Sequence, residues 1–313
     1  MNTTKNICVI GGCNMDIVGF PKDVLVRKDS NLGSVHLSPG GVGRNIAENI
    51  ALLGLKVDMF SAVGNDVNGD AVIRSTENSG VNMTYVRKVD FPTGTYLAVL
   101  DENMDMDIAI NSMEILKFID IDYVNSHYTS IMDSDVIVID ANLHYETFKY
   151  IVETFRNKVL FLDTVSTIKA SRIKEFIGCF HTIKPNKLES ETLTGIKITD
   201  LNSLKKSSDF YHERGVVNVC ISMGPDGVYY SDGVNQGIVK AKFMLPKNAT
   251  GAGDAFQAGL VYSYINEFSI IDSVKFSTGA AIMAMSSEET INKNINIESI
   301  KEFIKDLEVI TND

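Results

Sequence analysis

The sequence predicts an α/β protein in which a mostly parallel sheet is covered by helices on both faces. Short β-branched runs alternate along the chain with amphipathic segments of helical period. Several of the runs end in Asp, Gly or Pro, as strands buried in a parallel sheet often do. The 313 residues, of which 44% are hydrophobic and 22% charged, provide ample material for the core of such a fold.

The strands and helices alternate in chain order. Six runs are predicted as buried strands: Ile7–Ile10, Val57–Val63, Val136–Asp140, Val159–Asp163, His181–Lys184 and Val219–Met223. Six segments are predicted as helices: Gly43–Leu53, Gly69–Asn78, Tyr145–Phe155, Leu201–Arg214, Asp254–Tyr264 and Ile271–Met285. Right-handed crossovers gather the carboxyl ends of parallel strands at one edge of the sheet, where open α/β sheets bind ligands.

Two regions interrupt this alternation. Residues 18–38 have no helical period and contain the turn-rich Asp29–Gly33, whereas residues 93–111 alternate apolar and polar side chains and predict a β-hairpin. Together they predict a small sheet, too thin to be stable alone, which covers the main domain or pairs with another subunit. We expect one domain over residues 1–313, with a lid formed by about residues 17–38 and 93–112.

The charge balance limits the class of partner. The net charge of −11, from 40 acidic and 29 basic residues, argues against a protein that binds a nucleic acid polymer by neutralising its phosphates. No apolar run approaches the roughly 18 residues of a membrane span. The first residues lead directly into a strand, without the pattern of a signal peptide. These observations predict a cytoplasmic protein that acts on small molecules.

The segment Asn248-Ala-Thr-Gly-Ala-Gly-Asp-Ala-Phe256 is the most informative in the chain. Small residues before a helix let backbone N–H groups point at one place, and the helix N-terminus adds partial positive charge there. Asp254 at this position can take a proton from a hydroxyl that attacks a phosphate. Without context, the same pattern also fits an ordinary glycine-rich turn.

Two glycine-containing segments are candidates for binding a sugar. In Gly11-Gly-Cys-Asn-Met-Asp16, the polar pair Asn14 and Asp16 can grip vicinal hydroxyls, or can form an Asx-turn that stabilises the loop. In Ser38-Pro-Gly-Gly-Val-Gly-Arg-Asn45, three glycines allow a close backbone approach to a ligand, and the Asn45 amide suits a sugar hydroxyl. A plain hinge before a helix is the alternative for this segment. Arg44 is expected to be a solvated charge, with contact to a phosphate as the alternative.

Two further segments are candidates for binding a nucleotide. Asn186 and Glu189 lie three residues apart at a helix start, which suits hydrated Mg²⁺ on nucleotide phosphates. The alternative is a helix N-terminus whose acidic residue complements the dipole. Ile221-Ser-Met-Gly-Pro-Asp-Gly-Val228 either borders a nucleotide or is a hairpin turn.

In this order the motifs resemble those of the ribokinase-like (PfkB) family of sugar and nucleoside kinases, across essentially the whole chain. The matching elements are Gly11-Gly12 with Asn14 and Asp16, Gly40-Gly41-x-Gly43-x-Asn45, Asn186-x-x-Glu189, Ser222-x-Gly224-x-x-Gly227 and Gly251-Ala-Gly-Asp254. The resemblance implies a three-layer α/β/α sandwich with a small β-sheet lid. It also implies ATP and Mg²⁺ as cofactors, and phosphorylation of a primary alcohol of a sugar.

The resemblance also implies roles for individual residues. Asp254 would be the base, in an anion hole formed by Gly251, Ala252 and Gly253. The implied substrate-binding residues are Asn14, Asp16, Ser30, Asn31, Gly41, Asn45 and Thr95. The implied nucleotide-binding residues are Asn186, Ser222, Gly224, Gly227 and Thr250, with Glu189 at the metal. Ribokinases carry Asp-Thr-Thr where this chain has Asn248-Ala-Thr250, which leaves open whether a monovalent cation is used.

Within the family the chain looks most like the pseudouridine kinases. This resemblance rests on four segments, namely Asp29-Ser-Asn-Leu-Gly33, Gly40-Gly-Val-Gly-Arg-Asn-Ile-Ala-Glu-Asn49, Thr93-Gly-Thr-Tyr-Leu-Ala-Val-Leu-Asp101 and Asn248-Ala-Thr-Gly-Ala-Gly-Asp254. Ser30 and Asn31 add donors and acceptors that suit the amide edges of uracil. The implied reaction is the phosphorylation of the 5′-hydroxyl of pseudouridine by ATP, in a homodimer paired through the lid.

Three alternatives stay open beside this hypothesis. The first is a kinase of the same fold that acts on ribose, adenosine or inosine. The second is a nucleoside-binding regulator without activity, although such a protein has no need of a base at Asp254. The third, a dinucleotide-dependent dehydrogenase, is disfavoured because Gly11-Gly-Cys-Asn-Met-Asp16 does not match the spacing of a Rossmann fingerprint.

Overall fold

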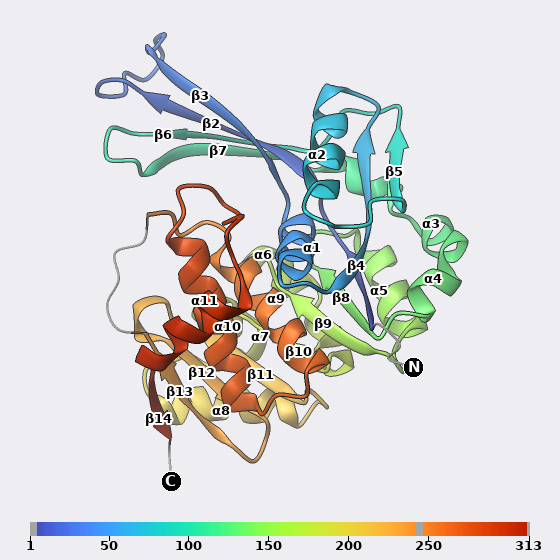
Figure 1. Cartoon of the computed structure of the whole chain (residues 1–313), viewed down its shortest axis with the longest axis vertical. Helices are drawn as coiled ribbons and strands as arrows, with labels where there is room; N and C mark the ends of the chain where they lie inside the picture. The colour runs from blue at the N-terminus through green and yellow to red at the C-terminus, as the bar shows by residue number, and fades with distance from the viewer. Residues whose placement is uncertain (1–4, 242–246, 312–313) are drawn as a thin grey trace.

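Ten strands form the main sheet of the computed structural model, which describes residues 5–241 and 247–311 (Figure 1). Their order is β14-β13-β12-β11-β10-β9-β8-β1-β4-β5, parallel from β11 to β5 and antiparallel from β11 to β14. The strands are β1 (Asn6–Ile10), β4 (Lys56–Gly64), β5 (Val86–Val89), β8 (Val136–Asp140), β9 (Val159–Asp163), β10 (Thr182–Ile183), β11 (Asn218–Ser222), β12 (Val228–Ser231), β13 (Gln236–Lys240) and β14 (Glu308–Thr311).

Helices cover both faces of this sheet, which confirms the predicted three-layer α/β/α fold (Figure 1). One layer contains α1 (Val42–Leu52), α2 (Val67–Glu77), α9 (Ala252–Ile265), α10 (Ile270–Met285) and α11 (Ile297–Phe303). The other contains α3 (Ile121–Ser126), α4 (Tyr128–Met132), α5 (Tyr145–Thr154), α6 (Thr167–Arg172), α7 (Lys187–Thr194) and α8 (Leu201–His212). No helix in the described ranges is long and apolar enough to span a membrane.

The packing of β1 explains why its sequence is apolar at nearly every position. Cys8 and Ile10 face the α5 layer, while Ile7 and Val9 face the α1 layer, and all four are fully buried. A strand buried on both faces cannot alternate with polar residues. The same reasoning predicts the other five strands correctly, within about one or two residues at each end.

A second sheet of four strands projects from the main body (Figure 1). Its strands, in the order β3-β2-β6-β7, are β2 (Asn14–Pro21), β3 (Gly33–Gly40), β6 (Thr95–Leu100) and β7 (Met106–Ser112). The predicted hairpin is confirmed as the antiparallel pair β6–β7, and β2 pairs with β3 antiparallel and with β6 parallel. We call these four strands the lid sheet. Only three residues separate the end of β1 from the start of β2, so the lid sheet is joined directly to the edge of the main sheet at which β1 ends.

Candidate active site

Glycines and charged residues lie together at the edge of the main sheet where neighbouring parallel strands end. Gly11 and Gly12 follow β1, Asp140 and Asp163 end β8 and β9, and Lys184 follows β10. From β1 the chain adds β4 and β5 on one side of the sheet and then β8 to β11 on the other, so the strand order reverses between β1 and β8. Open α/β sheets bind ligands at such a switch point. A cavity of about 220 Å³ lies at this edge, and the residues lining it are Val42, Asp163, Val165, Lys184, Asn186, Glu189, Ser222, Gly253 and Asp254.

The start of helix α9 forms one wall of the cavity. Gly251 caps the helix with a φ of +82°, and a Cβ there would lie 2.3 Å from the Thr290 carbonyl oxygen, so only glycine fits. At Gly253, a Cβ would lie 3.4 Å from Lys184 Nζ. The helix N-terminus and the Lys184 ammonium therefore face the same space, which suits a phosphate group.

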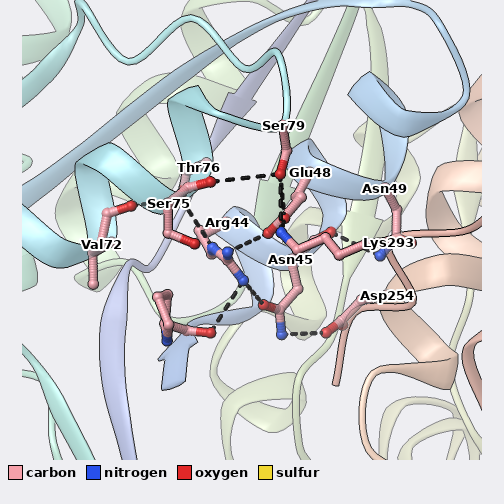
Figure 2. Close-up of polar contacts among 11 residues, drawn as sticks. Arg44, Asn45, Glu48, Asn49, Val72, Ser75, Thr76, Ser79, Asp254 and Lys293 are labelled. Carbon is pink, nitrogen blue, oxygen red and sulfur yellow. Dashed lines mark hydrogen bonds and ion pairs between the residues drawn. The ribbon is translucent and has the colours of Figure 1, made fainter. Parts of the chain in front are cut away.

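Asp254 lies in the first turn of α9, beside this space. Its Oδ2 accepts a hydrogen bond of 2.8 Å from Asn45 Nδ2, across 209 residues of sequence (Figure 2). Burial and the charge of Asp163 raise the pKa of Asp254 to about 8, against the opposing effects of the Asn45 hydrogen bond and of Lys184. A carboxylate with a pKa near neutrality can accept a proton from a hydroxyl and retain it.

Lys184 and Asp163 were assigned no role from the sequence. Both are at least nine-tenths buried, and Lys184 Nζ lies 3.4 Å from Asp163 Oδ2. Burial opposes the charge of Lys184, but Asp163, Glu189 and Asp254 outweigh it and hold the Lys184 pKa above its ordinary value. The sequence could have pointed to both residues, because Asp163 and Lys184 are charged and each stands at the end of a predicted strand, Lys184 directly before Pro185.

The glycines after β1 and at the start of α1 allow close contacts between these two chain segments. Asp140 Oδ2 accepts hydrogen bonds from the backbone N–H groups of Gly12 at 2.8 Å and of Gly43 at 2.9 Å. A Cβ at Gly11 would lie 2.3 Å from the same oxygen, and one at Gly41 would lie 2.3 Å from the Gly12 carbonyl oxygen. The fully buried Asp140 thus joins the loop after β1 to the start of α1.

The polar pair Asn14 and Asp16 starts the lid sheet. Asn14 Nδ2 donates to Asp16 Oδ1 at 2.5 Å, and burial raises the pKa of the Asp16 carboxyl above its ordinary value. Thr95 lies opposite Met15 in the adjacent strand β6, and its hydroxyl donates to the Thr93 carbonyl at 3.3 Å. The lid base therefore presents the amide of Asn14 and the carboxylate of Asp16 side by side, while Thr95, paired with Met15, lies on the other face of the lid sheet.

Ser30 and Asn31 lie at the exposed lid tip, and neither lines the cavity. The Asn31 side chain accepts from the Val26 N–H at 2.8 Å and donates to the Val26 carbonyl at 2.9 Å. In this position the Asn31 amide closes a turn of the lid.

Asn186 and Glu189 form a capping box at the start of α7, so the helix N-terminus that the sequence offered as an alternative is present. Glu189 Oε2 accepts from the Asn186 N–H at 2.9 Å and from Thr164 Oγ1 at 2.6 Å. Ser222 is joined to Asn186 by a parallel β-bridge. Asn186, Glu189 and Ser222 all line the cavity, so the capping box lies at the wall of the cavity itself.

The remaining predicted residues lie in the turn between β11 and β12 and at the start of α9. Gly227, with a φ of +94°, lies in the β11–β12 hairpin, where a Cβ would lie 2.4 Å from the Val239 carbonyl oxygen. The hairpin turn that the sequence offered as an alternative to a nucleotide contact at Ile221–Val228 is therefore present. Gly224 and Thr250 are exposed, and Ala252 begins α9.

The prediction that Arg44 is a solvated charge is wrong. Its side chain is 2% exposed and pairs with the fully buried Glu48 one helical turn further along α1 (Figure 2). The sequence signal was an acidic residue four positions after the arginine, which places both side chains on one helix face.

Comparisons with known proteins agree with this architecture. The profile of pfkB family carbohydrate kinases matches residues 4–297. The pseudouridine kinase of Escherichia coli (strain K12) is 37% identical over 99% of this chain and 100% of its own length. The guanosine-inosine kinase of Exiguobacterium acetylicum is 26% identical over 91% of this chain and 96% of its own length. The crystal structure of a sugar kinase from Clostridium perfringens superimposes with a TM-score of 0.89, at 36% identity and full coverage of both chains.

Proposed function

The chain belongs to the PfkB family of carbohydrate kinases, and on that premise we propose that it transfers the terminal phosphoryl group of ATP to the 5′-hydroxyl of pseudouridine. The observation that carries the kinase assignment is the position of Asp254, beside both the α9 N-terminus and the Lys184 ammonium. The similarity to a pseudouridine kinase over the full length supports the substrate.

The substrate-side residues suit a ribose-like sugar. Asn14 and Asp16 offer a donor and an acceptor 2.5 Å apart, close enough to contact neighbouring hydroxyls. Asn45, held against Asp254, would orient the sugar so that its 5′-hydroxyl meets the base. Asp254 then takes the hydroxyl proton while the 5′-oxygen bonds to the terminal phosphorus of ATP, and the bond from that phosphorus to ADP breaks with ADP as the in-line leaving group.

The opposite wall suits the phosphate groups. The N–H groups of Gly251 and Gly253 in the first turn of α9 and the Lys184 ammonium would face the transferred group, whereas the Ala252 N–H between them already donates to the Ala249 carbonyl at 3.4 Å. Donors of this kind stabilise charge that develops in the transition state, by about 3 kcal/mol for a well-aimed donor. Asn186, Ser222, Gly224, Gly227 and Thr250 would border the nucleotide.

Magnesium would reach this wall together with ATP. The described residues contain no group of three His, Cys, Asp or Glu side chains able to hold a metal ion. Mg²⁺ needs few protein ligands when nucleotide phosphates and waters complete its shell, so a single carboxylate at Glu189 fits this cofactor. When bound, the ion neutralises phosphate charge.

The lid sheet suits both base recognition and dimerisation. We propose that Ser30, Asn31 and Thr95 contact the uracil ring when the lid closes over the sugar and excludes water. Apolar side chains share one face of the lid sheet in adjacent strands, with Leu37 59%, Leu97 38% and Ile110 59% exposed. Exposed apolar side chains that share one face of the lid sheet support pairing with a second copy of the chain.

A substrate panel tests this function. With ATP and Mg²⁺, we expect pseudouridine to give a higher kcat/KM than uridine, ribose, adenosine, inosine or fructose, measured by ADP release. Ribose or adenosine ranking above pseudouridine would contradict the substrate assignment and leave the kinase assignment in place. Tight nucleoside binding without turnover of any compound would instead favour a regulator.

Asn248 bears on the use of a monovalent cation. Its Nδ2 donates to the Glu288 carbonyl at 3.1 Å, and its Oδ1 accepts from the Thr250 N–H at 2.8 Å. The neutral amide thus links the segment before α9 to the one after α10. We expect the initial rate to be the same in potassium and in tetramethylammonium salts at equal ionic strength. A rate that depends on potassium would contradict this expectation.

A further inference from the structure

A buried ion pair lies in helix α1, next to the proposed site (Figure 2). The Arg44 guanidinium has a polar partner on each side. Its Nε donates to Thr76 Oγ1 at 3.0 Å, its Nη1 donates to the Pro39 carbonyl and to Asn45 Oδ1, both at 3.1 Å, and its Nη2 pairs with Glu48. Burial lowers the pKa of Arg44 to about 10, so the group stays charged near neutral pH.

Glu48 extends this network to the segment that follows α10. Its Oε1 pairs with Lys293 and accepts from Ser79 Oγ at 2.6 Å, and Lys293 Nζ also donates to Ser79 Oγ at 2.9 Å (Figure 2). A buried pair is retained without penalty only when further hydrogen bonds satisfy both ions. Nε and Nη1 of Arg44 have such hydrogen bonds, and so does Glu48 Oε1, while Glu48 Oε2 faces Arg44 in the ion pair without a hydrogen bond; together these contacts hold Arg44 in one place.

The network determines which way the Asn45 amide points. Asn45 Oδ1 accepts from Arg44, and this leaves Nδ2 to donate to Asp254 Oδ2 at 2.8 Å. With the amide reversed, its oxygen would face the Asp254 carboxylate and its NH₂ group would face the guanidinium. Both reversed contacts are repulsive, so the charge of Arg44 selects the observed orientation.

We propose that Arg44 is a positioning residue for phosphoryl transfer: it turns the Asn45 amide nitrogen toward Asp254, and it ties that orientation to the lid base through Pro39. This inference rests on the proposed function. Pro39 is in β3, opposite Met15 of β2, so the carbonyl that Arg44 holds belongs to the strand pair at the lid base. Movement of the lid and alignment of the base are coupled through one guanidinium.

The charged groups around Asp254 make this coupling measurable. Asp163 and Asp140 face Asp254 from β9 and β8 and raise its pKa, whereas Asn45 and Lys184 lower it. Arg44 is also close enough to interact with Asp254 through its charge. Arg44→Lys keeps that charge, but an ammonium cannot hold Glu48, Pro39 and Asn45 in the planar geometry of a guanidinium.

The test compares Arg44→Lys with the wild-type protein. We expect the pKa of the Asp254 carboxyl, measured by ¹³C NMR without ligands and assigned with Asp254→Asn, to rise by roughly one pH unit when its hydrogen bond is lost. The acid limb of kcat/KM for the nucleoside is expected to move in the same direction. Arg74→Lys, the same substitution at an exposed position of α2, is expected to change neither.

A double-mutant cycle separates positioning from charge. Asn45→Ala is expected to raise the Asp254 pKa, and Arg44→Lys is expected to add nothing in that background. An additional shift in the double variant, or an unchanged Asp254 pKa in a folded Arg44→Lys protein, overturns the inference. If Arg44→Lys does not fold, Thr76→Val removes the hydrogen bond at Nε, and a folded Thr76→Val protein with an unchanged Asp254 pKa overturns it equally. The NMR readout needs no turnover, so it remains decisive even if no nucleoside is phosphorylated.

Discussion

Replacing Asp254 by asparagine is expected to lower kcat by roughly 10²–10⁴-fold, the contribution of a positioned general base. The side chain keeps its size and its place beside Asn45, so the dissociation constant for the nucleoside is expected to change little. Steady-state kinetics and calorimetric titration measure the two quantities. Asp70→Asn is the matched control, because the Asp70 side chain on α2 is 43% exposed and pairs with the surface residue Lys88. A near-normal kcat in Asp254→Asn would show that the base is elsewhere.

The same variant is expected to be more stable than the wild type at alkaline pH. The pKa of Asp254 is about 8 when the protein is folded, against about 3.8 ordinarily, so the folded state binds this proton more tightly. The wild type therefore loses stability relative to Asp254→Asn as the pH rises from the ordinary pKa to the folded one, and no further loss follows above it. Each kcal/mol of this stability difference corresponds to roughly 2–4 °C in Tm for chains of about 150–250 residues, and to somewhat less for this longer chain. A difference in Tm that does not grow with pH would contradict the raised pKa.

Replacing Lys184 by methionine is expected to lower kcat/KM for ATP by roughly 10²–10³-fold, the range for removing one preorganised group that stabilises developing charge. Methionine keeps much of the side-chain volume but removes the ammonium that faces Gly253 and Asp163. The Asp254 pKa is expected to rise as well, because Lys184 is one of the groups that lower it.

Lys187→Met is the matched control for this variant. Lys187 lies three residues further along, exposed in the first turn of α7, and does not line the cavity. It carries the same charge on nearly the same stretch of chain. Equal losses in Lys184→Met and Lys187→Met would indicate a general effect of net charge on ATP binding, and would contradict a specific role for Lys184.

The strands were predictable because burial on both faces leaves little choice of residue. In β1, Ile7 to Ile10 must all be apolar, and such runs are visible without any structure. Helices α3, α4, α6 and α11 were missed because each has only five to seven residues, too few to establish a helical period, and of α7 only the start at Asn186 and Glu189 was predicted. The strands β5 and β12 to β14 were missed because each has only four or five residues; β5, β13 and β14 are also partly exposed, whereas β12 is buried throughout.

The motifs that carry backbone constraints were equally visible. Gly251 must be glycine because of its positive φ and its contact with Thr290, and Gly41 because of its contact with Gly12. A backbone conformation or contact that only glycine can adopt determines the residue at that one position, so such positions appear in the sequence as a pattern of glycines. That pattern led to Asp254 and to the resemblance to sugar kinases.

By itself, then, the sequence determined the layered fold, the family and the segment around Asp254, because each depends on local periodicity or on a glycine that no other residue can replace. Only the tertiary structure decided the charges around that segment. Lys184 approaches Asp163, and Arg44 turns Asn45 toward Asp254, across separations of 21 and 209 residues. An ion pair places no constraint on the residues next to it in sequence. In the sequence, an arginine that will be buried beside a carboxylate therefore cannot be told from a surface arginine, and only the fold brings its partners together.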